Sequence, residues 1–179
     1  MKHIYLVRHC QATGQAAEAP LTTSGVEQAE QLVPFFDTHP IDRIVSSPFR
    51  RAIATIQPLA EERGLMIEQD QRLEERVLSG QPMEDWLDRL RDTFDDLSLC
   101  YRGGESSKTA IHRVNELLKE VLSGDANHIV LVSHGCLLTL LMKSVDDQFG
   151  FKEWQQLSNP DVFLLTCTEN DRHIKRIWS

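Results

Sequence analysis

Five side chains of this sequence could together bind and cleave a phosphate ester. They are two histidines, two arginines and one glutamate, each placed where a strand-like stretch gives way to a loop or a helix: His9, His134, Arg8, Arg51 and Glu75. Phosphoryl transfer depends mostly on positioning and on fixed positive charge. Arginine suits this task, because its planar group binds two oxygens at once and stays protonated. The set therefore predicts chemistry on phosphate.

Each of the five side chains has an expected role. Arg8 and Arg51 are the expected phosphate clamps. His9 is the expected nucleophile, which attacks phosphorus as a neutral imidazole and forms a phosphohistidine that water then hydrolyses; nearby arginines would disfavour its protonation. We expect His134 to donate a hydrogen bond to the phosphoryl oxygens. Glu75, with a raised pKa, would protonate the leaving oxygen and later help to deprotonate water. The scheme requires no metal and no cofactor.

Taken one at a time, these segments also have simpler interpretations. Arg8 and His9 could form a polar strand end, and Glu75 lies in the charged run 72–76, which is typical of a solvated face. The segment 46–52 could be only a loop that leads into a helix. Gly104-Glu105-Ser106 could be only a helix start with an acidic first turn. A histidine and a glycine after a buried strand, as in 133–135, point more strongly to a site.

The elements that must position these side chains follow from apolar periodicity. Strands are expected at 4–7, 41–45 and 129–132, with two closing strands at 163–168 and 173–178. Two apolar stripes with helical spacing lie between them, formed by Val26, Ala29, Leu32, Val33 and Phe36 and by Ala110, Ile111, Val114, Leu117, Leu118 and Val121. The alternation favours an α/β fold, a three-layer α/β/α sandwich on a mainly parallel sheet.

The start of the first helix is ambiguous in the sequence. Thr22, Thr23 and Ser24 could each act as its N-cap. Ser24 and Glu27 also have the spacing of a capping box.

The order of the elements brings the chemistry-bearing segments together. Ligands of parallel sheets gather in the crevice at the carboxyl ends of the strands. Arg8-His9, Ser46-Ser47 and Ser133-His134 each follow a predicted strand, so we expect them to meet at one edge of the sheet.

Composition limits the partners of the protein. The chain has 179 residues, 41% of them hydrophobic, which is enough for the core of one domain over 1–179. A formal charge of -8 argues against nucleic acid or an anionic membrane as a partner, because the long-range field repels both. The four cysteines form no CxxC pair, which favours reduced thiols in a cytoplasmic protein. No signal peptide or membrane-spanning stretch is predicted, and the oligomeric state is left open.

The joint pattern resembles the histidine phosphatase superfamily, also called the phosphoglycerate mutase-like superfamily, and within it the short phosphatases. The family's first motif reads Arg-His-Gly, and its second reads Ser-x-x-x-Arg-Ala-x-x-Thr, matched here by Ser47, Arg51, Ala52 and Thr55. Further similar segments occur in the family's order: Leu21-Thr22 with Gly25, Gln28 and Ala29; Leu73-x-Glu75; Gly104-Glu105-Ser106; and Val132-Ser133-His134-Gly135. The resemblance implies the layered α/β fold, a metal-free phosphohistidine mechanism and the roles given above, with Gly135 also at the substrate.

Three positions depart from the family's usual pattern. Cys10 stands where most members have glycine, and either fills a small buried space or is an oxidisable thiol activated by nearby arginine. Gln15 falls where many members have an asparagine that contacts phosphate, and Gln11 where many have glutamate. Both amides could still donate to phosphate, so we expect both to bind substrate.

The segment after Glu75 bears on the substrate. Its apolar stripe, formed by Met83, Trp86, Leu87, Leu90, Phe94 and Leu97, indicates a helix packed on the core, or else part of a lid at 76–104 that selects the leaving group. The segment lacks the paired basic clamp expected of a mutase, so transfer to water is favoured. The expected function is a phosphomonoesterase acting on a small phosphorylated substrate. A phosphoglycerate mutase, a phosphoprotein phosphatase and a non-catalytic phosphate-binding protein are the alternatives.

Overall fold

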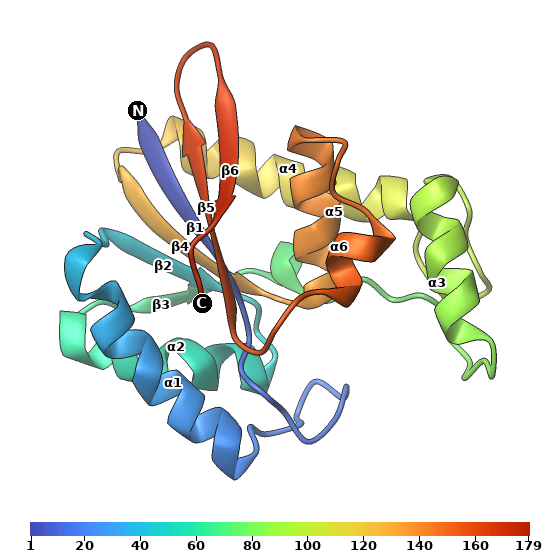
Figure 1. The fold of residues 1–179 in the computed structure, drawn as a ribbon, viewed down its shortest axis with the longest axis horizontal. Helices are drawn as coiled ribbons and strands as arrows, with labels where there is room; N and C mark the ends of the chain where they lie inside the picture. Colours follow the sequence, from blue (N-terminus) through green and yellow to red (C-terminus); the bar gives the residue numbers. More distant parts are fainter.

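A six-stranded sheet forms the centre of the computed structural model, which describes all 179 residues (Figure 1). The strand order is β3-β2-β4-β1-β5-β6. The strands span β1 Lys2–Arg8, β2 Arg43–Ser46, β3 Ile67–Gln69, β4 His128–Ser133, β5 Asp161–Cys167 and β6 Arg172–Arg176. The first four are parallel to one another, whereas β5 runs antiparallel to β1 and to β6. The predicted mainly parallel α/β sheet is confirmed.

Helices cover both faces of the sheet. They span α1 Thr23–Phe35, α2 Arg50–Arg63, α3 Trp86–Asp95, α4 Ser107–Ser123, α5 Gly135–Val145 and α6 Phe151–Gln155, with short 3₁₀ turns at Phe36–Thr38 and Gln71–Leu73. Figure 1 shows α1 and α2 on one face, α4 and α5 on the other, and α3 beyond the edge of the layers. None of the helices is both long and apolar enough to span a bilayer.

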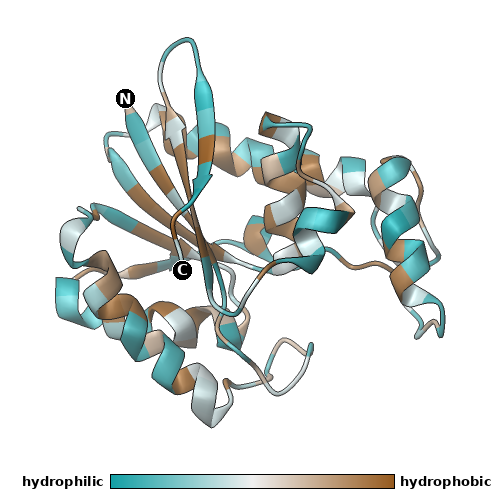
Figure 2. Ribbon diagram, in the orientation of Figure 1, coloured by the Kyte–Doolittle hydropathy of each residue, from teal (hydrophilic) through white to brown (hydrophobic).

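Two hydrophobic cores result from the alternation of side chains along the strands. In β1, Ile4 and Leu6 pack into the core beneath α4 and α5, while Tyr5 and Val7 pack into the core beneath α1 and α2. Figure 2 shows the central strands as hydrophobic and the outer surfaces of the helices as mainly hydrophilic. Because both faces of the parallel strands are buried, their sequences read as continuous apolar runs.

Specific residues explain where α1 begins and where α2 ends. The hydroxyl oxygen of Thr22 accepts a hydrogen bond from the Gly25 amide at 3.0 Å, so Thr22 is the N-cap of α1 and a capping box at Ser24 is wrong. Val26, expected in the buried stripe, is exposed because the face of α1 that meets the sheet contains Ala29 and Leu32 instead. At the end of α2, Gly64 adopts φ 63°, a left-handed conformation that glycine tolerates without strain.

Several strand bounds differ from those predicted. The second strand begins at Arg43 rather than at 41, since 41–42 lead into it as a loop. The short edge strand β3 was not predicted, because its three residues carry no periodic signal. The closing pair, β5 and β6, lies within about two residues of its predicted ends.

Candidate active site

Three strand ends bring the predicted site residues together. Arg8 at the end of β1 is in register with Ser133 at the end of β4. The His9 amide donates to the Ser133 carbonyl at 3.1 Å, and the Ser47 amide donates to the Val132 carbonyl at 2.9 Å. The expected convergence at one edge of the sheet is therefore confirmed. The rings of His9 and His134 meet edge to face, with their centroids 5.2 Å apart.

The surroundings of His9 fix the tautomer of its ring. Nδ1 lies 2.7 Å from the Cys10 carbonyl oxygen, which can only accept, so Nδ1 carries the proton. Nε2 is then unprotonated and accepts a hydrogen bond from Nε of Arg51 at 3.2 Å. Burial, with smaller contributions from Arg51 and Arg8, lowers the pKa of His9 to about 4. The ring is therefore neutral at pH 7, with a lone pair directed into the site.

His134 is oriented by Ser47. The Ser47 hydroxyl oxygen accepts from the Phe49 amide at 3.2 Å and lies 2.8 Å from Nε2 of His134. If the hydroxyl donates its proton to Nε2, Nδ1–H of His134 becomes a buried donor without a protein partner. Burial and the nearby His9 lower the pKa of His134 well below its usual range, so this ring too is neutral.

Arg8 and Arg51 each donate hydrogen bonds to backbone carbonyl groups, which orient their guanidinium groups. Nη1 of Arg51 donates to the carbonyl oxygens of Gln15 and Ala16 at 3.1 and 2.8 Å. Nη1 of Arg8 donates to those of Leu157 and Ser158, both at 3.3 Å, while its Nε is buried without a partner. Arg8 thus keeps one donor free at the site, while Nε of Arg51 donates to His9.

The loop 157–160, which the sequence analysis missed, supports the first motif. The side-chain amide of Asn159 donates to the His9 carbonyl at 2.8 Å. Asp161 is fully buried, pairs with Arg176 at 2.7 Å and accepts from the Ser158 amide at 3.0 Å. Neither Asn159 nor Asp161 lies in a motif with local spacing, so only their position next to β1 reveals this role.

Glu75 lies against the N-terminus of α5. Its Oε1 accepts from the amides of Arg76 and Leu137 at 2.8 and 2.9 Å, and its Oε2 accepts from the Cys136 amide at 3.1 Å. Burial raises the pKa of Glu75, while these three amides and Arg8 act in the opposite direction. The simpler interpretation of Glu75, a solvated residue of a charged run, does not hold, because three backbone amides donate to its carboxyl group.

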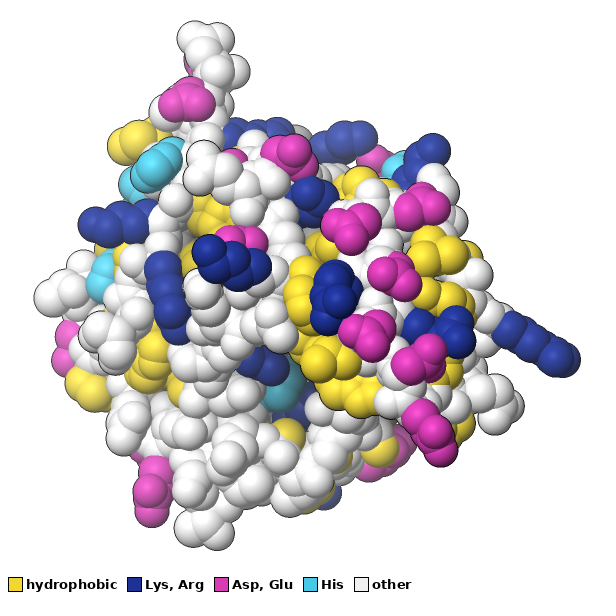
Figure 3. Space-filling view, turned by 45° about the vertical axis from the view of Figure 1, so that its right-hand side comes forward, with side chains coloured by type: hydrophobic (Ala, Val, Ile, Leu, Met, Phe, Trp, Pro, Cys, Tyr) yellow, Lys and Arg dark blue, Asp and Glu magenta, His cyan; other side chains and the backbone are white.

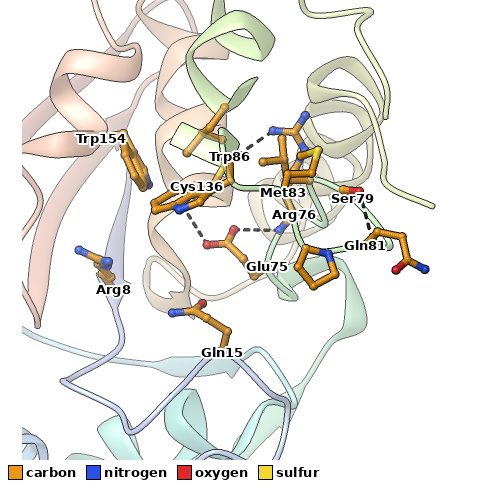
Figure 4. Close-up of a pocket in the computed structure, with 13 residues that line it drawn as sticks. Arg8, Gln15, Glu75, Arg76, Ser79, Gln81, Met83, Trp86, Cys136 and Trp154 are labelled. Carbon is orange, nitrogen blue, oxygen red and sulfur yellow. Dashed lines mark hydrogen bonds between the residues drawn. The ribbon is translucent and has the colours of Figure 1, made fainter. Parts of the chain in front are cut away.

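A cavity of about 550 Å³ adjoins this cluster (Figure 4). Arg8, Gln15 and Glu75 border it on the side that faces His9 and His134. Its other walls come from 76–90, from the start of α5 and from α6. They are formed by Arg76, Leu78, Ser79, Gln81, Pro82, Met83, Trp86, Leu90, Cys136 and Trp154. In Figure 3 a histidine and basic side chains lie in a hollow, and hydrophobic side chains gather beside it. The cavity thus lies directly against Arg8 and Glu75.

The family model for the histidine phosphatase superfamily, branch 1, matches residues 4–178. This match extends over nearly the whole chain and includes every residue of the cluster described above. The chain belongs to the histidine phosphatase superfamily. The predicted family and fold are thereby confirmed, and the predicted phosphoric monoester hydrolase agrees with the family's chemistry.

Similar proteins carry names of two activities. The chain is 27% identical to phosphoserine phosphatase 1 of Hydrogenobacter thermophilus over 150 residues, which cover 75% of this chain and 71% of that protein. It is 29% identical to a probable phosphoglycerate mutase, GpmB, of Serratia proteamaculans, with 81% and 75% covered. A solved structure of a mycobacterial glucosyl-3-phosphoglycerate phosphatase has a TM-score of 0.80 at 24% identity, with 98% of this chain and 97% of that chain covered.

Gln11 and Gln15 occupy different places in this histidine phosphatase. Gln15 lines the cavity. The side-chain oxygen of Gln11 accepts from the Thr22 hydroxyl at 2.8 Å, and its backbone amide donates to Gln28, so Gln11 is tied to the start of α1 and does not line the cavity.

Cys10 is completely buried between β1 and the helices that cover it. Burial raises the pKa of its thiol to about 11, so the thiol stays protonated at neutral pH. Its amide donates to the Thr55 hydroxyl at 2.8 Å. These observations favour the small buried filler over the oxidisable thiol.

The apolar stripe of the segment 76–104 is partly buried and partly exposed. Leu90 and Phe94 are buried in the core, whereas Trp86 and Leu87 are 49% and 37% exposed. The segment is also tied down, because the buried Arg76 donates to the Glu105 carbonyl at 2.9 Å and to the Thr93 hydroxyl at 3.1 Å. Arg76 was not singled out in the sequence, since an arginine within a charged run gives no sign that it will be buried.

Proposed function

We propose that this histidine phosphatase hydrolyses a small phosphomonoester through a phosphohistidine on His9. The observation that carries the proposal is the state of the His9 ring, which is neutral, with its proton on Nδ1 and the lone pair of Nε2 directed to Arg51. That nitrogen is the atom that would attack phosphorus. Arg51 would then transfer its hydrogen bond from Nε2 to a phosphoryl oxygen.

The other side chains would stabilise the charge that develops during transfer. Nε of Arg8 and Nδ1 of His134 are buried without a protein partner, and Nε of Arg51 donates to His9. Buried donors of this kind act strongly on a transferring phosphoryl group. Glu75 borders the cavity beside them and would protonate the leaving oxygen. In the second step it would take a proton from the water that hydrolyses the phosphohistidine.

Hydrolysis is favoured over mutase transfer by the charges of the cavity. A mutase must hold the carboxylate of a phosphoglycerate with cations outside the phosphate site. Only Arg8 and Arg76 are cationic among the lining residues. Two nitrogens of the Arg76 guanidinium donate to protein oxygens and the third is buried without a partner, so the cavity has no pair of cations outside the phosphate site. Mutase transfer of the phosphoryl group is the second candidate function, because similar proteins are named as probable phosphoglycerate mutases. Incubation with 3-phosphoglycerate and its bisphosphate primer should yield no isomer, and formation of 2-phosphoglycerate would establish mutase transfer instead.

The setting of the enzyme is part of the proposal. We expect a single domain over 1–179 that acts on small molecules in the cytoplasm, without nucleic acid or membrane as a partner. All four cysteines are unpaired, as thiols are in reducing compartments. No group of three or more histidine, cysteine or acidic side chains is arranged to hold a metal ion, and each proposed step uses side chains of the chain itself.

Rapid quench with ³²P-labelled phenyl phosphate tests the proposal. We expect a labelled protein that is acid-labile and alkali-stable, as a phosphohistidine is, and that is absent from His9→Ala. His173→Ala is the matched control, because His173 is exposed on β6, away from the carboxyl ends of β1, β2 and β4 that carry the site. Label that persists in His9→Ala, or that alkali removes, would refute the assignment of the nucleophile.

A further inference from the structure

The cavity beside the phosphate site has a wall of aromatic and aliphatic side chains. Trp86, Met83 and Leu90 come from α3 and the loop before it, Leu78 comes from the segment after Glu75, and Trp154 comes from α6. Figure 4 shows Trp86 and Trp154 on the far side of the cavity from Gln15, with Arg8 and Glu75 between. Trp86 lines the cavity and is 49% exposed, so part of its indole is accessible.

Contacts between aromatic rings hold the side chains of this wall against one another. The rings of Trp86 and Trp154 meet edge to face at 6.4 Å and 87°. Phe151 stacks behind Trp154 at 5.5 Å, and the guanidinium of Arg91 covers Phe151 at 5.2 Å. Aromatic pairs in such arrangements contribute beyond the area they bury. The two indoles are therefore fixed by α3 and α6 before any substrate arrives.

The polar groups of the cavity do not suit a small charged alcohol. A leaving group such as serine or glycerate carries a carboxylate, which needs a cation of its own. Arg8 lies at the proposed phosphate site. Nε and Nη1 of Arg76 donate to Glu105 and Thr93, and the one nitrogen of this group without a partner, Nη2, is itself buried. Glu75 is acidic, and the other polar lining side chains, Gln15, Ser79 and Gln81, are neutral. The volume of about 550 Å³ also exceeds what such an alcohol fills.

We propose that the substrate is a phosphomonoester whose alcohol carries a bulky apolar group, of the size of an aromatic ring or larger. This proposal rests on the proposed phosphatase activity. The apolar group packs against the Trp86–Trp154 wall while the phosphate lies at His9. Trp86 and Trp154 are then specificity-determining residues, and phosphoserine and phosphoglycerates are poor substrates.

A series of esters with matched leaving groups tests this substrate class. Ethyl phosphate, 2-phenylethyl phosphate and 2-(1-naphthyl)ethyl phosphate all release a primary alcohol, so they differ mainly in apolar surface. Roughly 100 Å² of ring surface removed from water predicts a kcat/KM for the phenylethyl ester on the order of 50-fold above that for the ethyl ester. Phosphoserine should lie close to the ethyl ester.

Substitutions in the wall should remove this preference without removing catalysis. Trp86→Ala and Trp154→Ala should each lower the ratio of kcat/KM for 2-phenylethyl phosphate to kcat/KM for ethyl phosphate at least fivefold. Leu87→Ala is the matched control, because Leu87 is exposed on the same helix and does not line the cavity. Trp154→Phe, which keeps an aromatic ring, replaces Trp154→Ala if that variant does not fold.

The outcomes separate this proposal from the one on which it rests. If the three esters are hydrolysed equally, or phosphoserine exceeds 2-phenylethyl phosphate, the apolar substrate class is wrong and the phosphatase activity stands. If the protein hydrolyses no ester, 4-nitrophenyl phosphate included, the proposed function fails. Calorimetry still decides the apolar class in that case: 3-phenylpropylphosphonate should bind on the order of 50-fold more tightly than methylphosphonate, and equal binding overturns it.

Discussion

The replacement of Gly135 by alanine tests how the site positions its first arginine. Gly135 is the first residue of α5, between His134 and the amides that hold Glu75. A Cβ built on Gly135 would lie 3.0 Å from Nε of Arg8, 3.2 Å from its Cζ and 3.3 Å from its Nη2. Since an ordinary contact begins at about 3.4 Å, the guanidinium would have to move by about 0.4 Å. The backbone does not oppose alanine, because φ of Gly135 is not positive.

The expected result is a loss of activity without a loss of stability. Misplacement of a catalytic group by 1 Å costs about 100-fold in rate, so a shift of this size should lower kcat/KM about three- to tenfold. Alanine is a better helix former than glycine by up to about 1 kcal/mol, less at a first residue, so the thermal midpoint should stay the same or rise. The measurements are kcat/KM for 4-nitrophenyl phosphate, the inhibition constant of inorganic phosphate and thermal unfolding.

Gly124→Ala provides the control for this comparison. Its Cβ would make only ordinary contacts, at 3.7 and 3.8 Å, at the end of α4. We expect unchanged kinetics in Gly124→Ala, and in Gly135→Ala a weaker inhibition by phosphate in proportion to the loss of kcat/KM. Full activity of Gly135→Ala would refute the reasoning, and so would a fall in its thermal midpoint that accounts for the lost activity.

Three further predictions concern single groups of the site. His9 has a pKa of about 4 in the folded protein and near 6.5 in the unfolded chain, so the unfolded chain takes up the proton first and stability is lost as the pH falls from about 6.5 to 4. Between pH 7.0 and 4.5, the free energy of unfolding measured with urea should fall by about 2 kcal/mol more in the wild type than in His9→Ala. Equal decreases would contradict the buried neutral ring. Glu75→Gln should lower kcat/KM for ethyl phosphate on the order of 100-fold or more but kcat/KM for 4-nitrophenyl phosphate far less, because nitrophenolate leaves without a proton and kcat/KM reports only the steps up to its release; equal losses in kcat/KM would exclude Glu75 as the acid. Hydrogen peroxide should leave activity unchanged, because Cys10 is buried and protonated; an inhibition that dithiothreitol reverses and that Cys10→Ala lacks would restore the redox hypothesis.

The sequence alone determined the kinds of group in the site and the class of fold. Arg8, His9 and Ser133-His134 directly follow apolar runs, and a run of that kind is a local signal of a buried strand. Strand ends in a mainly parallel sheet meet at one edge, so the convergence could be predicted without coordinates. The apolar stripes of α1 and α4 were visible for the same reason, since helical periodicity is a property of neighbouring residues.

Tertiary structure decided what each of those groups can do. The proton of His9 is fixed on Nδ1 by the Cys10 carbonyl, and Glu75 is held by amides of α5 that lie more than 60 positions away in the chain. Asn159 and Trp154 join the site from the region of α6 and β5, and no local pattern marks them. Tautomers, pKa shifts and cavity walls depend on distances between segments remote in sequence, and these distances exist only after the layers have packed.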